Sequence, residues 1–251
     1  KGNVSGVSSN QIKEYMKKKY NLNVGEGSFN HPDNLNSFYV EREYIKPMIS
    51  SLKEKKPFRD KTLSKWFPKY VAKQQKIEKD MIAGLEKVVD YPHGGIVMDS
   101  ELREKAPEVT AHELGHAYNY NISKFKPLFN LRSSLWPSLL GIPLSLYGRS
   151  TDQPELSALG IGLSTLPAIG TLADEFNASR IAVKTMKELG GTPKKSRLVK
   201  AFGTYLLHSA PGLVRSGLGI GANILASNMK KEDPLKKVYE DLPESNWRKQ
   251  V

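Results

Sequence analysis

Cysteine is absent from the sequence. Disulfide bonds and thiolate metal ligands are therefore both excluded, and a zinc site in this chain would have to use histidine and carboxylate side chains. Histidine is itself scarce, with 5 in 251 residues. The chain starts at Lys1 rather than Met, and we expect a processed or trimmed chain, so a signal peptide or an N-terminal anchor could have been lost with the missing start.

Long, clean hydrophobic runs are also missing. Two uncharged stretches, at residues 134–147 and 156–173, are borderline in length for a membrane span, and polar or small residues dilute the second. A third stretch, at about 201–227, is rich in Gly, Ala and Leu but contains His208 and Arg215. Three weak apolar helices are compatible with a membrane-embedded bundle or with a soluble helical core, because small residues favour close helix packing in both solvents.

The formal net charge is +12, yet no nucleic-acid-binding module is recognisable. Lys and Arg occur in short, dispersed clusters outside any aromatic-rich segment, at residues 17–19, 53–56, 194–197 and 230–231. Nucleic acid is therefore disfavoured as a partner. A solvated basic surface is the first interpretation, and attraction to an anionic membrane surface or an acidic protein partner is the alternative.

The N-terminal part of the chain has helical periodicity. Within the first 25 residues apolar side chains recur at helical spacing, and Ser8 or Ser9 is expected to cap this helix. A loop is expected at 25–36 and a second helix at about 63–89. The pattern predicts one domain with appended segments.

One HExxH motif is present, formed by His112, Glu113 and His116. On an α-helix two histidines four residues apart lie on one face, where both rings can bind a single ion. Glu113 is placed to take a proton from a water molecule that the metal activates. Pro107 suits the first turn of a helix, so we expect the motif in the second and third turns of a helix from about 107. The alternative is an accidental histidine pair on an ordinary packed helix.

A short strand is predicted at 96–98, after a break at residues 92–95. In zinc peptidases a strand just upstream of the motif helix often forms the sheet edge along which the substrate backbone lies, and we expect that role here. His93, in the preceding loop, is interpreted as a surface residue and not as a ligand.

A catalytic zinc normally has three protein ligands and one open position. Glu175 is the candidate for the third ligand, because it stands with Asp174 directly after the second uncharged stretch. A carboxylate pair at the end of an apolar helix is costly to bury unless it is coordinated or paired. The alternative is a solvated helix terminus, at which both carboxylates face water.

These features resemble the family of membrane-associated neutral zinc metallopeptidases of bacteria. The resemblance covers about residues 94–225, and it rests on HELGHA (112–117), a segment with Pro127, Leu131, Arg132 and Pro137, the apolar stretches, Glu-Phe-Asn-Ala-Ser-Arg (175–180), and residues 197–205. It implies zinc held by His112, His116 and Glu175, with Glu113 as general base. It also implies a mainly α fold: a zincin-like core with a short edge strand, and a bundle of apolar helices that would be embedded in a membrane.

The chain departs from that family in three places. Its apolar segments are shorter and more polar, the stretch at about 41–89 is longer, and the basic tail after Asn228 has no counterpart. We expect these additions to serve a partner or a local assembly. The chain is thus divided into an N-terminal helical region with an insertion (1–92), a metallopeptidase-like core (93–227) and a basic tail (228–251). Membrane association is the predicted location, with a soluble protein as the alternative.

The predicted function is that of a zinc-dependent metallopeptidase that hydrolyses peptide or protein substrates. Glu113 would take the proton of the attacking water and deliver it to the leaving amine. Asp174 or Ser179 is expected to orient a ligand, while Tyr118 and Tyr120 either face the cleft or serve only packing. The rival hypothesis is a catalytically silent, metallopeptidase-like structural protein that acts as a scaffold or assembly component through its basic surface.

Overall fold

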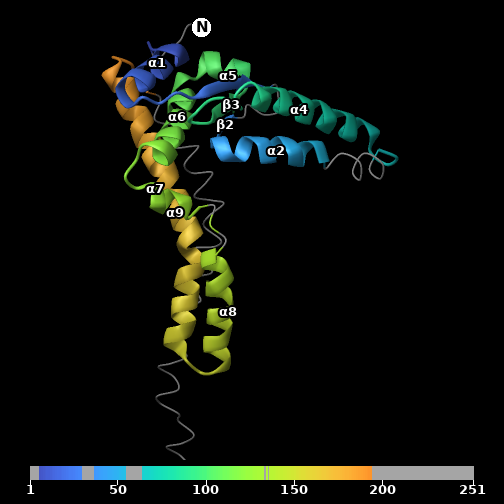
Figure 1. The fold of residues 1–251 in the computed structure, drawn as a ribbon, viewed down its shortest axis with the longest axis vertical. Coiled ribbons are helices and arrows are strands. Elements are labelled where there is room, and N and C mark those ends of the chain that lie inside the picture. Colours follow the sequence, from blue (N-terminus) through green and yellow to red (C-terminus); the bar gives the residue numbers. More distant parts are fainter. Residues whose placement is uncertain (1–5, 30–36, 55–63, 133, 135, 194–251) are drawn as a thin grey trace, which may run out of the picture. The chain divides into compact units, whose positions relative to one another are not determined.

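The computed structural model describes residues 6–29, 37–54, 64–132, 134 and 136–193, and these residues are mainly helical (Figure 1). The predicted mainly α class is thereby confirmed, with a small three-stranded sheet among the helices. The chain forms two compact units. Of the described residues, the first unit contains 6–29, 37–54, 64–132 and 169–193, and the second contains 134 and 136–168.

The first unit holds the sheet and most of the helices. Its elements are α1 (Ser9–Tyr20), β1 (Gly25–Ser28), β2 (Ser37–Val40), α2 (Arg42–Glu54), α4 (Pro68–Glu86), β3 (Gly95–Met98), α5 (Ser100–Lys105), α6 (Pro107–Asn121), α7 (Lys126–Asn130) and the second half of α9 (Pro154–Glu188). Helix α1 begins as predicted, because the Ser8 hydroxyl accepts the Gln11 amide at 3.2 Å and the Gln11 side chain accepts the Ser8 amide at 2.8 Å.

The sheet has the strand order β1-β3-β2, with β3 parallel to β1 and antiparallel to β2. The strand predicted at 96–98 is confirmed, but the edge position predicted for it is wrong, because β3 is hydrogen-bonded on both sides. The prediction of a loop at 25–36 is also wrong for residues 25–28, because they form β1. That segment is half glycine, and Gly27 is required there because a Cβ would lie 2.1 Å from the Gly84 carbonyl oxygen of α4.

Two hydrophobic clusters cover the two faces of the sheet. Ile96 and Met98 of β3 pack with α1, α6 and α9, whereas Val97, which points to the opposite face, packs with α2 and α4. The helix predicted at 63–89 is shorter than expected, since α4 begins at Pro68 and leaves Trp66 exposed before it. The boundary predicted at residue 92 stays a prediction, although the sheet joins strands from both sides of it.

Helix α6 begins at Pro107, as the sequence predicts, and it is buried on nearly all sides. One side packs against α9 at very short range. A Cβ added to Gly115 would lie 2.5 Å from the carbonyl oxygen of Ala178, so the two backbones touch at this point. Only glycine at position 115 permits this close approach of the two backbones. The functional site depends on it, because its residues come from both helices.

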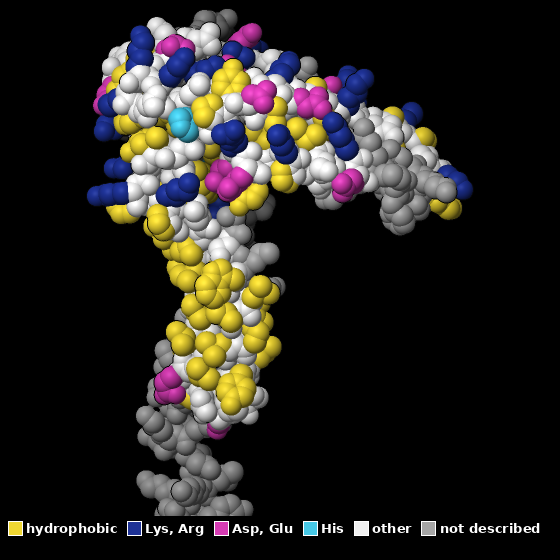
Figure 2. All heavy atoms as spheres, in the orientation of Figure 1, with side chains coloured by type: hydrophobic (Ala, Val, Ile, Leu, Met, Phe, Trp, Pro, Cys, Tyr) yellow, Lys and Arg dark blue, Asp and Glu magenta, His cyan; other side chains and the backbone are white. Residues whose placement is uncertain are grey.

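The second unit contains α8 (Trp136–Ser150) and the first half of α9, which pack as an antiparallel hairpin. Small residues lie between the two helices, since a Cβ on Gly141 would be 2.5 Å from the Gly160 carbonyl oxygen. Large apolar side chains point outward, with Leu139 67% and Leu146 60% exposed (Figure 2). Helix α9 is long and apolar enough to cross a membrane by length and composition. The third apolar stretch, His208 and the basic tail lie outside the described residues.

We expect Gly115→Ala to destabilise the protein, because the added methyl group forces α6 away from α9. Overpacking of this kind costs about 1–3 kcal/mol, which is measured as the free energy of unfolding in urea. Gly162→Ala is the matched control, since no atom lies within 4 Å of a Cβ there and alanine favours a helix. Equal stabilities of the two variants would contradict the role assigned to Gly115.

Candidate metal centre

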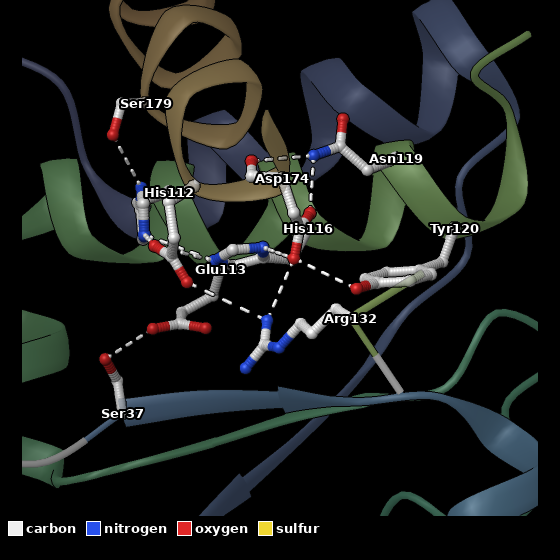
Figure 3. Close-up of polar contacts among 10 residues, drawn as sticks. Ser37, His112, Glu113, His116, Asn119, Tyr120, Arg132, Asp174 and Ser179 are labelled. Atoms are coloured by element: carbon white, nitrogen blue, oxygen red, sulfur yellow. Dashed lines mark hydrogen bonds and ion pairs between the residues drawn. The ribbon is translucent and has the colours of Figure 1, made fainter. Parts of the chain in front are cut away.

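Helix α6 places His112, Glu113 and His116 in the interior of the first unit. All three side chains are buried, and the two imidazole rings meet edge to face with their centroids 4.7 Å apart. Their Nε2 atoms face each other at 3.2 Å (Figure 3). The motif spacing has therefore brought two potential ligand atoms together on one helix face, as expected.

Glu175 reaches the same point from α9. Its side chain is wholly buried, and its Oε2 atom lies 3.2 Å from His112 Nε2 and 3.5 Å from His116 Nε2. Asp174 is wholly buried beside it, within the helix rather than at its end. The alternative of a solvated helix terminus is thus excluded for both carboxylates.

The three ligand atoms have the spacing that a small tetrahedral ion requires. An ion with bonds of about 2.0 Å separates its ligand atoms by about 3.3 Å, and the three atom pairs here are separated by 3.2, 3.2 and 3.5 Å. Two imidazoles and one carboxylate are donors that suit zinc, although other first-row ions accept them too. Among the described residues, His112, His116 and Glu175 form a buried group close enough to bind a metal ion.

The electrostatics of the group also favour a cation. Glu175 Oε1 is buried without a hydrogen-bond partner among the described residues. Burial alone would lower the pKa of His116, but the carboxylates of Asp174 and Glu175 outweigh it and raise the pKa to about 10. Facing lone pairs and buried carboxylates are unfavourable unless positive charge lies between them. The donor set therefore fits a divalent metal ion.

Each histidine is held at its other ring nitrogen. The Ser179 hydroxyl lies 3.2 Å from His112 Nδ1, and Asp174 Oδ2 lies 3.0 Å from His116 Nδ1, at ion-pair distance although outside hydrogen-bond geometry. A hydrogen bond at this nitrogen fixes the tautomer and the orientation of a metal-binding imidazole, and Ser179 is placed for that role at His112. Both residues named in the sequence as candidates for this role therefore lie beside a histidine.

Asp174 is held in turn by three donors. Asn119 Nδ2 donates to Oδ1 at 2.7 Å, and the Tyr120 hydroxyl and Arg132 Nη1 donate to Oδ2 at 3.0 and 2.9 Å. Tyr120 thus has a polar role near the site, whereas Tyr118 packs edge-on against Tyr20, with the ring centroids 4.9 Å apart. Sequence reasoning missed Asn119, and its only local signal is its position one turn after His116.

Glu113 points away from this network toward β2. Its Oε1 atom accepts a hydrogen bond from the Ser37 hydroxyl at 2.7 Å, and the side chain is buried (Figure 3). Ser37 was not identified from the sequence, because its contact depends on a strand that was not expected there. His93 accepts the Asn23 amide at Nδ1 at 2.8 Å, so it is structural, in agreement with its exclusion as a ligand.

Comparisons of the chain with family models, curated proteins and solved structures gave no match. The resemblance to the zinc metallopeptidase family therefore stays a prediction from the motif residues.

We expect zinc to stabilise the chain and chelation to reverse the effect. Free zinc at a hundred times its Kd stabilises a one-site protein by about 2.7 kcal/mol, which is measured as a rise in the unfolding midpoint. His112→Ala should abolish this rise because it removes a ligand. His93→Ala is the matched control, and loss of the zinc effect in both variants would contradict the assigned site.

Proposed function

We propose that this chain is a zinc-dependent metallopeptidase. The single observation that supports this most strongly is the triangle of His112 Nε2, His116 Nε2 and Glu175 Oε2, with a further buried carboxylate, Glu113, on the same helix. Three ligands leave one position open on a tetrahedral ion, which is the arrangement of a catalytic rather than a structural zinc. When bound, zinc would polarise the scissile carbonyl group and lower the pKa of a water molecule.

Glu113 is assigned as the general base. Its carboxylate is buried on the helix that carries both histidines, and it takes no part in the triangle. The Ser37 hydroxyl occupies Oε1, which leaves Oε2 to accept the proton of the attacking water. The same carboxylic acid then gives that proton to the leaving amine, so one residue serves both steps.

Strand β2 is the element along which we place the substrate. Among the described strands β2 pairs with β3 alone, so its other edge has no partner within that part of the chain. An extended peptide can add to such an edge through backbone hydrogen bonds. Ser37, which contacts the general base, is the first residue of this strand. The proposed substrate edge is therefore β2, in place of the strand that the sequence predicted at 96–98.

A cavity of about 410 Å³ lies at the far end of β2. It is lined by Glu41, Glu43, Asp90, Asn121 and Lys126 together with Arg42, Lys46 and Val89. Because Glu41 directly follows β2, a peptide that extends along the strand from Ser37 would reach this cavity. We propose that it receives a side chain of the substrate, and its charged lining favours a polar one.

Membrane association is part of the proposal. The hairpin of α8 and α9 has small residues between its helices and large apolar residues on its outside, which is the reverse of a helix pair that folds in water. Helix α9 is also long and apolar enough to cross a bilayer. A bilayer would cover these side chains, and the net charge of +12 favours anionic lipids.

We expect Glu113→Gln to bind zinc as the wild type does and to lose peptide hydrolysis. General acid–base catalysis contributes about 10²- to 10⁴-fold, so kcat/KM should fall by at least about 10²-fold. Exposed Glu14→Gln on α1 is the matched control. Hydrolysis retained by the Glu113 variant would remove this residue from the mechanism, and zinc binding without hydrolysis in the wild type would favour the scaffold hypothesis.

We expect the full chain to sediment with anionic vesicles, and Leu139→Asp with Leu146→Asp to weaken this binding. A charged side chain costs about 2.5–3.5 kcal/mol at the centre of a membrane helix. Tyr44→Asp, at an exposed position of α2, is the control. Membrane insertion of the hairpin would be contradicted if the Leu139/Leu146 double variant and the Tyr44 control sedimented equally. It would also be contradicted if the wild-type protein stayed in the supernatant.

A further inference from the structure

Arg132 lies next to the candidate metal centre and contacts both buried carboxylates of α9. Its Nη1 atom is 2.9 Å from Asp174 Oδ2 and 3.7 Å from Glu175 Oε1. The side chain is 39% exposed, whereas both carboxylates are wholly buried. One guanidinium therefore connects a potential metal ligand to the residue that faces His116.

The contact with Asp174 compensates a buried charge. Asn119 and Tyr120 donate neutral hydrogen bonds to this carboxylate, and Arg132 adds a full positive charge. A buried carboxylate is costly unless it is both hydrogen-bonded and paired. Arg132 thereby helps to hold Asp174 in place 3.0 Å from His116 Nδ1.

The contact with Glu175 distinguishes the two oxygens of that carboxylate. Oε2 faces the Nε2 atoms of His112 and His116, whereas Oε1 has no hydrogen-bond partner among the described residues and lies near Arg132. A carboxylate beside a divalent ion can bind it through one oxygen or through both. The positive charge near Oε1 favours binding through Oε2 alone.

We infer that Arg132 is a positioning residue that restricts Glu175 to one ligand oxygen and so keeps a coordination position open for water and substrate. This inference rests on the proposed metal site. With a divalent ion bound, the positive charges of the ion and Arg132 balance the carboxylates of Glu113, Asp174 and Glu175. Both contacts come from Nη1, whose two N–H groups can point to different carboxylates, and the delocalised guanidinium is less strongly hydrated than the compact lysine ammonium.

The test uses the full chain with Co²⁺ as the probe, because the visible absorption of bound Co²⁺ is intense in four-coordinate sites and weak when the coordination number rises. Arg132→Met removes the charge at similar volume, and Arg149→Met, in the second unit, is the matched control. Affinities for Co²⁺ and Zn²⁺ are measured by competition with a chelator, and folding is checked by circular dichroism.

We expect Arg132→Met to bind both ions about 10- to 100-fold more weakly and to show a weaker visible band, because Glu175 then binds through both oxygens. The control should match the wild type. Arg132→Lys should recover most of the affinity, because the lysine ammonium can still pair with Asp174. It should not recover the intensity of the visible band. If Arg132→Met does not fold, the band of Arg132→Lys decides the inference.

An unchanged visible band in Arg132→Met, or in Arg132→Lys where that variant decides, would overturn the inference. A wild-type chain that binds neither ion would overturn both this inference and the proposed function. A wild-type chain that binds Co²⁺ but hydrolyses no peptide would remove only the peptidase activity, because affinity and absorption still decide the role of Arg132.

Discussion

The contact between α6 and α9 is the constraint on which the rest of the site depends. Backbone atoms of Gly115 and Ala178 meet there, and this brings Glu175 to the two histidines of the motif. The resulting group is buried and rich in lone pairs, which makes it unfavourable without a cation. Metal binding would therefore be coupled to folding, because the packing of α6 on α9 forms the site and a bound ion would offset the cost of burying it.

Local sequence patterns predicted the parts of the fold that depend on short-range interactions. The Ser8 cap, the start of α6 at Pro107 and the strand at 95–98 each have a signal within a few residues. The partners of that strand do not. β1 and β2 lie more than 50 residues earlier in the chain, and the glycines of β1 resemble a loop although they serve close packing, of Gly27 against α4 and of Gly25 against Val88 and Tyr91. A local pattern could therefore not predict that β3 lies at the centre of the sheet.

The candidate site divides in the same way. His112, Glu113 and His116 form a motif, and Glu175 was found because a buried carboxylate after an apolar stretch needs a chemical reason. Ser37 carries no such signal, and Arg132 was named only as part of the family-like segment at 127–137, without a role at the site. Both residues reach the site across a long sequence separation. The hairpin shows a different limit: composition cannot tell which residues face inward, and only the structure shows the small residues between its helices and the large ones outside.

The central claim is that His112, His116 and Glu175 hold a metal ion, and X-ray absorption at the zinc edge tests it most directly. The purified full chain, loaded with zinc and freed of excess, should retain one zinc ion per chain. Its spectrum should show two imidazole nitrogens and oxygen ligands at about 2.0–2.2 Å. Absence of retained zinc, or a ligand shell of oxygen atoms without the scattering of imidazole rings, would contradict the account.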